Sequence, residues 1–283
     1  MDVLLTNDDG IESTGIRVLA EALSTFADVT VVAPADDRSA VGRSRSREVT
    51  VEEHDLGYAV SGTPTDCVIC GLCALVPDAD LVVAGCNEGA NLGEYVLGRS
   101  GTVSAAVEAT FFAVPAIAVS LYIPGSEVDF LEYAARESEY EHAVRAAAYL
   151  AEGAPSRGVF EHADYLNVNA PIPENGADRG ANARNGRSSS GDADSDGGGG
   201  ATMEVTRPSH VYDMDAVRDG ESIELRDCIW GRMADGDVPD PEGTDRRAVL
   251  EGRVSVSPLT APHTTEHHES LDELAAAYGR PGR

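Results

Sequence analysis

Residues 3–10 read Val3-Leu4-Leu5-Thr6-Asn7-Asp8-Asp9-Gly10, an apolar run that stops in two adjacent carboxylates. The apolar part is typical of a buried strand, and ligands bind at the carboxyl ends of strands in open α/β sheets. Two neighbouring carboxylates repel each other there, and a cation between them removes that cost; their oxygens suit Mg²⁺, Mn²⁺ or Ca²⁺. The alternative is a polar turn, which Asn, Asp and Gly favour for local reasons.

The first half of the chain alternates apolar strands with helices. Continuous apolar runs lie at residues 3–5, 29–33, 81–84, 116–121 and 165–168, and helical patterns begin near residues 14, 63, 102 and 138. This alternation predicts an α/β fold with a mainly parallel sheet and helices on both faces. The loops at 7–10, 34–39 and 85–93 are polar, and in such a sheet they open on the same edge.

The second half is organised differently. Residues 174–200 are of low complexity and contain no apolar anchor, so we expect a flexible insertion there. Strand patterns near 203–205, 222–225 and 253–257, with a helix at 271–278, predict a smaller β-rich region. The expected organisation is therefore an α/β core at 1–173, an insertion at 174–200 and a β-rich C-terminal region at 201–283.

Acidic residues dominate the composition. The chain carries 49 Asp and Glu against 21 basic residues, all of them Arg, for a net charge of −28. Such a surface repels itself unless salt screens it, which predicts a protein from a high-salt cytoplasm. No basic stripe is present to neutralise phosphates, so nucleic acid is not expected as a partner. Neither a membrane span nor a signal peptide is expected, and the predicted location is cytoplasmic.

Cysteine and histidine spacing raises two further possibilities for metal sites. Cys67-x-x-Cys70-x-x-Cys73 has a spacing compatible with zinc or an iron–sulfur cluster. The preceding Thr63-Pro64 is a helix start, however, so packing of the three thiols along one helix face is the preferred interpretation. A solvated polar segment is likewise preferred over a metal site for His263, His267 and His268.

The polar loops of the first half supply an all-oxygen set of donors. Asp8 and Asp9, the Ser39 hydroxyl and the Asn87 carboxamide suit a hard divalent cation. Ser100-Gly101-Thr102 opens a helix, whose N-terminal N–H groups attract anions. A cation beside an oxyanion cradle predicts a metal-dependent phosphate hydrolase. The sequence has no GxxxxGK[ST] loop and no GxGxxG after a strand, so nucleotide binding of those two kinds is poorly supported.

Taken in order over about two-thirds of the chain, these motifs resemble the SurE family, the stationary-phase survival proteins. The matching pieces are Leu5-Thr-Asn-Asp-Asp-Gly10, Val32-Ala-Pro34 with Arg38-Ser39, Gly62-Thr-Pro-Thr-Asp-Cys67, Gly85-Cys-Asn87-Glu-Gly-Ala-Asn91-Leu-Gly93, Ser100-Gly-Thr-Val103, Ala105-Ala-Val-Glu108, Pro115-Ala-Ile-Ala-Val-Ser120, Thr244-Asp245 and Gly252-Arg-Val-Ser-Val-Ser-Pro-Leu259.

The resemblance implies a Rossmann-like core and a C-terminal region used in forming a homodimer or homotetramer. It implies a divalent cation, Mg²⁺ or Mn²⁺, held by Asp8, Asp9, Ser39 and Asn87. Asp8 and Asp9 are the expected catalytic residues, with Asp8 a candidate nucleophile or base. The residues expected to contact phosphate or substrate are Asn7, Arg43, Asn91, Ser100, Gly101 and Thr102. Family substrates are nucleoside 5′-monophosphates and often 3′-monophosphates, with polyphosphate for some members.

One segment departs from the family pattern. Ser39 is followed by Arg43, Arg45 and Arg47, where the family usually has a short run rich in Ser and Asn. These guanidinium groups either bind phosphate directly or offset neighbouring acids, and the sequence leaves both interpretations open. Arg99 replaces a common Tyr, which affects the expected recognition of the base.

Two other functions remain as alternatives to a phosphatase. One is a nucleotide- or phosphate-binding protein without catalysis, which would bind a monophosphate in the same crevice and release it unchanged. The other is a glycosyltransferase-like Rossmann domain, which would require a nucleotide-sugar donor.

Overall fold

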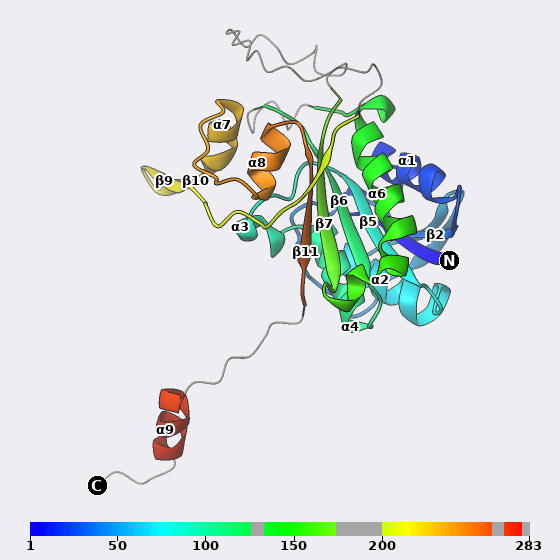
Figure 1. The fold of residues 1–283 in the computed structure, drawn as a ribbon. Helices are drawn as coiled ribbons and strands as arrows, with labels where there is room; N and C mark the ends of the chain where they lie inside the picture. Colours follow the sequence, from blue (N-terminus) through cyan, green and yellow to red (C-terminus); the bar gives the residue numbers. More distant parts are fainter. Residues whose placement is uncertain (126–132, 174–199, 262–268, 279–283) are drawn as a thin grey trace.

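A nine-stranded sheet forms the centre of the computed structural model, which describes residues 1–125, 133–173, 200–261 and 269–278. The strand order is β3-β4-β2-β1-β5-β6-β7-β11-β8. Figure 1 labels five of these strands, β2, β5, β6, β7 and β11. Six of the eight neighbouring pairs are parallel. Its strands are β1 (Asp2–Thr6), β2 (Asp28–Pro34), β3 (Val51–His54), β4 (Gly57–Val60), β5 (Leu81–Glu88), β6 (Ala116–Tyr122), β7 (Tyr165–Pro171), β8 (Met203–Val205) and β11 (Val254–Leu259).

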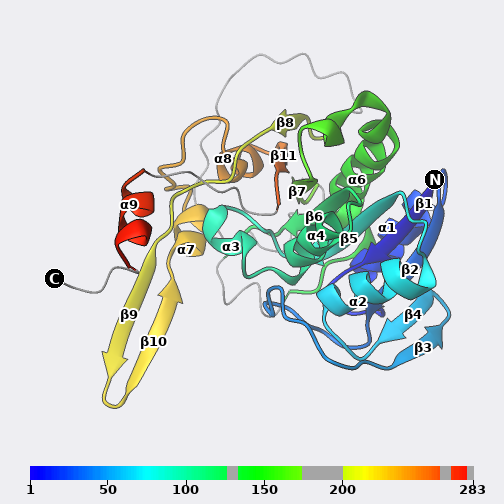
Figure 2. The same ribbon diagram turned by 90° about the horizontal axis from the view of Figure 1, so that it is seen from below.

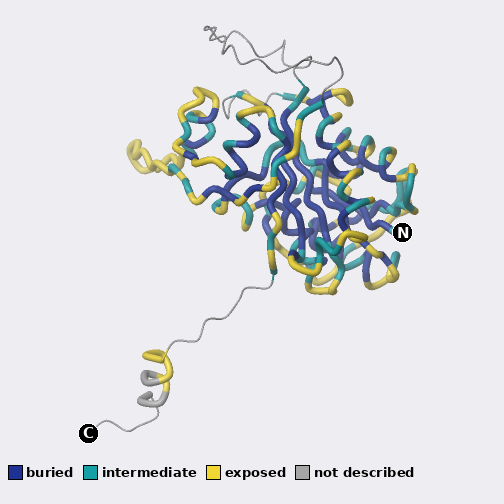
Figure 3. Tube along the Cα trace, viewed as in Figure 1, coloured by how far each residue is buried: buried dark blue, intermediate teal, exposed yellow. Residues whose placement is uncertain are grey.

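Helices cover both faces of this sheet, which confirms the predicted fold class. Helix α1 (Thr14–Leu23) packs with α6 (Glu141–Gly153), and α2 (Pro64–Cys70) packs with α4 (Gly101–Phe111). Successive residues of β1 point to opposite faces, so Val3 and Leu5 belong to the apolar core that includes α1 and α6. Leu4 belongs to the core that includes α2 and α4. The central strands are buried along their length (Figure 3).

The strand order brings the predicted polar loops together. Strand β1 lies between β2 and β5, and all three run parallel, so their carboxyl ends share one edge. The third loop differs in one detail from the prediction. After a register shift between Ala84 and Asn87, β5 continues to Glu88, so Asn87 belongs to the strand rather than to a loop.

The C-terminal part of the chain contributes to the same sheet. Strand β11 pairs antiparallel with β7, and β8 pairs parallel with β11. A separate hairpin, β9 (Met214–Asp219) and β10 (Ser222–Asp227), projects from the body of the molecule (Figure 2). Helices α7 (Ile229–Ala234) and α8 (Asp245–Leu250) follow it, and α9 (Glu269–Tyr278) ends the described chain. The short helical segments are η1 (Gly71–Leu75), α3 (Glu94–Leu97), η2 (Glu137–Tyr140), η3 (Pro155–Arg157) and η4 (Val159–Glu161).

Helix α2 begins as the sequence predicts. The Thr63 hydroxyl accepts from Asp66 N, and the Asp66 carboxylate accepts from Thr63 N, which forms a capping box with Pro64 in the first turn. The thiols of this region differ in exposure, since Cys67 is buried and Cys73 is exposed in η1. They therefore share the buried face only in part.

Several predictions concern residues outside the described ranges. The expected flexible insertion lies there except for Gly200, and so do His263, His267 and His268. The boundaries at 173 and 200 accordingly stay predictions. Within the described ranges, no helix combines the length and the apolar character needed to cross a membrane.

Candidate active site

The paired carboxylates lie at the carboxyl end of β1. Asp8 is buried and Asp9 is half-buried. Asp8 Oδ1 accepts a short hydrogen bond from the Thr102 hydroxyl, and Asp9 Oδ2 accepts from Glu88 N at 2.9 Å. The two side chains therefore point to different neighbours, one towards the start of α4 and the other towards the end of β5.

Burial and neighbouring negative charge disfavour ionisation of this pair. Desolvation raises the pKa of Asp8 and that of Asp9, and the Asp8 charge raises the Asp9 pKa further. Glu88 and Asp37 add negative charge on the same side. A cation bound near the carboxylates would offset these effects by stabilising their charged forms, so the local field favours a positively charged ligand.

Ser39, in the loop that follows β2, and Asn87, in β5, complete the predicted cation ligands. The Ser39 hydroxyl is exposed and donates to Asp37 Oδ1 at 2.6 Å. The Asn87 amide nitrogen donates to the Gly89 carbonyl, which leaves Asn87 Oδ1 as the acceptor of that side chain. Both residues line a cavity of about 500 Å³ together with Asp8.

The donor set fits a hard cation rather than zinc. No cluster of three or more His, Cys, Asp or Glu suited to a metal occurs among the described residues, so this site depends on two carboxylates supplemented by neutral oxygens. Asn7 Oδ1 is also buried, and it has no hydrogen-bond partner among the described residues. Mg²⁺ and Mn²⁺ accept such mixed oxygen ligands and retain several waters.

Helix α4 begins directly against Asp8. Ser100 is its N-cap, with the hydroxyl accepting from Val103 N at 3.0 Å. A Cβ at Gly101 would lie 2.7 Å from Asp8 Oδ2, so only glycine allows this close approach. The N–H groups of the first turn consequently lie next to the Asp8 carboxylate: that of Val103 donates to Ser100 Oγ and that of Thr102 to Asp8. A helix N-terminus beside carboxylates is the arrangement expected for a cation beside a phosphoryl group.

Asn91 fixes the loop after β5 instead of pointing freely into the cavity. Its amide nitrogen donates to Ser120 Oγ at 2.9 Å, and its backbone N–H donates to Asn169 Oδ1 at 2.7 Å. Its carbonyl accepts from the side chains of Asn167 and Asn169. Asn91 still lines the cavity, so its predicted contact with substrate stays a prediction.

Arg43 lies apart from these groups. Its guanidinium is 3.3 Å from the Glu108 carboxylate and 4.6 Å from the centre of the Phe111 ring. It is not one of the residues that line the cavity. This geometry favours the interpretation in which Arg43 offsets a neighbouring acid, and its contact with phosphate stays a prediction.

The far end of the cavity is apolar and was not identified from the sequence. Its lining residues come from α3, from the end of β6, and from the hairpin and α7; they include Tyr95, Val96, Tyr122, Ile123, Met214 and Trp230. The Arg99 guanidinium lies 3.9 Å from the centre of the Tyr95 ring. The cavity thus joins polar residues at the sheet edge to apolar and aromatic residues from later parts of the chain. Trp230, the only Trp of the sequence, was the available signal.

The fold and this edge define a class: α/β proteins with paired carboxylates at the end of the first strand, one of them directly against a helix N-terminus beside a cavity. The family model for survival protein SurE matches residues 3–191, and the chain belongs to the SurE family, as its motifs predict. A relative from Haloarcula marismortui, called 5′-nucleotidase SurE, is 61% identical over 98% of this chain and 94% of its own. Another of that name, from Natronomonas pharaonis, is 60% identical over 98% and 100%.

A solved structure agrees with the fold. The crystal structure of SurE protein from Aquifex aeolicus has a TM-score of 0.72 and 30% identity, and the match covers 97% of this chain and all of that one. The relatives at about 60% identity come from halophilic archaea, which agrees with the acidic composition of this chain.

Proposed function

We propose that the protein is a metal-dependent phosphatase that hydrolyses nucleoside 5′-monophosphates to nucleoside and phosphate, with 3′-monophosphates as further candidate substrates. The observation that carries the proposal is the cavity itself, which joins Asp8, Asn87 and Ser100 at one end to an apolar end at the other. A phosphoryl group matches the first end, and a nucleoside matches the second.

The prediction of an enzyme is confirmed by the relatives, since both halophile proteins carry the name 5′-nucleotidase over nearly the full length. The cation and the particular substrates belong to the proposal. Asp8, Asp9, Ser39 and Asn87 would hold Mg²⁺ or Mn²⁺. When bound, such a cation withdraws charge from phosphoryl oxygens and lowers the pKa of a coordinated water.

The protein's own residues would orient the reaction. The Thr102 hydroxyl holds one oxygen of Asp8, so the other oxygen is directed towards Gly101 and the first turn of α4. From that position Asp8 can act as nucleophile or as base. N–H groups of the first turn would donate to phosphoryl oxygens, which stabilises the charge that develops during transfer.

Release of phosphate from a panel of nucleoside monophosphates in molar KCl tests the proposal. We expect release with Mn²⁺ or Mg²⁺ that a chelator abolishes. Asp8→Asn should lower kcat for phosphate release by at least about 10³-fold, because it removes both a ligand charge and the candidate nucleophile. A folded enzyme that binds monophosphates and releases no phosphate would favour the non-catalytic alternative.

We also propose a homodimer or homotetramer. The hairpin carries exposed apolar side chains, with Ile223 60% and Leu225 74% exposed. Exposed apolar side chains gathered on one hairpin are typical of a contact between copies. Light scattering in high salt tests the assembly, and a monomer at micromolar concentration would contradict it. The cytoplasmic location stays a prediction.

A further inference from the structure

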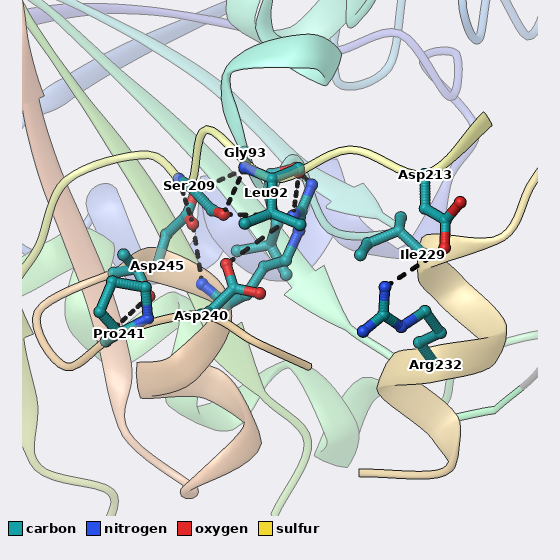
Figure 4. Close-up of polar contacts among 12 residues, drawn as sticks. Leu92, Gly93, Ser209, Asp213, Ile229, Arg232, Asp240, Pro241 and Asp245 are labelled. Carbon is teal, nitrogen blue, oxygen red and sulfur yellow. Dashed lines mark hydrogen bonds and ion pairs between the residues drawn. The ribbon is translucent and has the colours of Figure 1, made fainter. Parts of the chain in front are cut away.

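A buried carboxylate joins the wall of the cavity to the C-terminal part of the chain. Asp245, the first residue of α8, has no exposed surface. Its Oδ2 accepts from Gly93 N at 2.7 Å, and its Oδ1 accepts from Ser209 N at 3.0 Å and from Arg246 N at 2.8 Å (Figure 4). A single side chain thus holds two backbone segments more than a hundred residues apart in the sequence.

The next residue reinforces the same junction. The buried Arg246 guanidinium donates to the carbonyl groups of Leu92 and Val211 and to Ser209 Oγ. It also lies 3.8 Å from a carboxylate oxygen of Asp240. These acceptors and the Asp240 charge match most of the buried cation, while Arg246 Nε has no hydrogen-bond partner among the described residues. The backbone around Gly93 is therefore held from both sides.

Gly93 occupies a particular position in the cavity wall. Residues 89–91 line the cavity before it, and Tyr95 and Val96 line it afterwards. Glu94 N donates to the Ser209 carbonyl at 2.9 Å, and Tyr95 stacks on Tyr212 with 5.6 Å between ring centres. Gly93 has φ of +82°, and a Cβ there would lie 2.3 Å from Arg246 Nη2. The Asp245 contact consequently fixes the backbone at Gly93, between the polar lining residues 89–91 and the lining residues Tyr95 and Val96.

We propose that Asp245 is a positioning residue that sets the apolar end of the cavity, which takes the nucleoside if the proposed function holds. It does so through Gly93 N and Ser209 N, without contact with the ligand itself. The phosphate end is held independently, by β1 and the start of α4. Loosening the Asp245 contact should weaken binding of the nucleoside half and leave binding of the phosphate half intact.

The test is Asp245→Asn. In the native protein, Ser209 N and Arg246 N both donate to Asp245 Oδ1. In the variant these two donors keep the single amide oxygen on their side. The amide nitrogen then faces Gly93 N, so the variant removes that bond with almost no change in volume. Asp66→Asn is the matched control, because the buried Asp66 carboxylate also accepts backbone N–H groups, from Ser46 and Thr63, and does not line this cavity.

Adenosine and inorganic phosphate serve as probes for the two halves, measured in molar KCl with Mg²⁺. Quenching of Trp230, which lines the cavity, follows adenosine, and calorimetry follows phosphate. In Asp245→Asn we expect the Kd of adenosine to rise about tenfold and that of phosphate to stay within about twofold. Asp66→Asn should leave both values unchanged.

An equal loss for both ligands, or an unchanged adenosine Kd, would overturn the proposal. If Asp245→Asn does not unfold cooperatively, Gly93→Ala replaces it, since the added methyl group displaces the same junction without removing a charge. The same split between the two ligands is then expected, and its absence overturns the proposal. Because both probes are hydrolysis products, the result does not depend on turnover, and failure of the phosphatase assay remains a separate outcome.

Discussion

The Asp8 carboxylate occupies the space that a side chain at residue 101 would need. The position of Cβ at residue 101 would be 2.7 Å from Asp8 Oδ2 and 2.8 Å from Asp8 Cβ. Because Thr102 holds the other oxygen, any displacement of the side chain also breaks that hydrogen bond. Asp8 can therefore take this orientation only because residue 101 is a glycine, which has no Cβ.

Gly101→Ala should therefore lower the rate of phosphate release by about 100-fold, since a shift of about 1 Å in a reacting group has an effect of that size. Gly98→Ala is the matched control. Gly98 lies three residues earlier, and a Cβ there meets no atom within 4 Å. Steady-state kinetics on a nucleoside monophosphate decide the matter; equal rates for the two variants would contradict the assigned role of Asp8.

Sequence reasoning found the polar end of the cavity because its residues follow strands directly. Asp8, Ser39 and Asn87 stand at or just after the ends of three neighbouring parallel strands, so the topology alone brings them together. Tyr95, Trp230 and Asp245 could not be found in this way. Their contacts join segments far apart in sequence, and no periodic pattern records such pairs.

At the scale of elements, predictions succeeded where a buried face leaves a pattern. The strands β1, β2, β5, β6 and β7 were each expected from a continuous apolar run. Strands β3 and β9 were not expected, because β9 is exposed throughout and β3 is exposed along most of its length. The exposed strand β10 was nevertheless expected at 222–225, where Ile223 and Leu225 alternate with charged residues. Strands β3 and β9 have neither a buried face nor so regular an alternation.

One carboxylate stabilises the segment η2, which directly precedes α6, and this stabilisation depends on pH. Glu139 in η2 is 1% exposed, and its carboxylate accepts from the Tyr133 hydroxyl at 2.8 Å and from the Arg136 backbone and side chain. Burial opposes ionisation, but these donors outweigh it and lower the pKa of Glu139 to about 2. The folded state therefore prefers the charged form.

Because the folded pKa is depressed, this stabilisation is present above the unfolded pKa near 4.5 and is lost as pH falls towards 2. Glu139→Gln should lower the free energy of unfolding by about 2 kcal/mol at pH 7 and by much less at pH 3. Glu141→Gln, at the exposed start of α6, should have no such effect. Urea unfolding at the two pH values measures the difference; a deficit that is equal at both would refute the role.

For the whole molecule, the net charge of −28 is the dominant property. Screening reduces repulsion between surface carboxylates as the Debye length falls from about 10 Å at 0.1 M salt to about 3 Å at 1 M. The midpoint of thermal unfolding should therefore rise by at least about 10 °C over this range of KCl. Sucrose of equal osmolality should give a much smaller rise, and an equal rise would point to solute exclusion instead of charge.

The antiparallel pairing of β11 with β7 has a consequence for the order in which the chain is made. Strand β7 is buried at every position, yet its partner on one side is supplied by residues 254–259, near the end of the chain. During translation, β7 is synthesised long before that partner exists. Every nascent chain therefore passes through a stage in which an apolar strand presents unpaired N–H and C=O groups. The growing polypeptide is most exposed to wrong pairing in that interval, and the last quarter of the chain ends it.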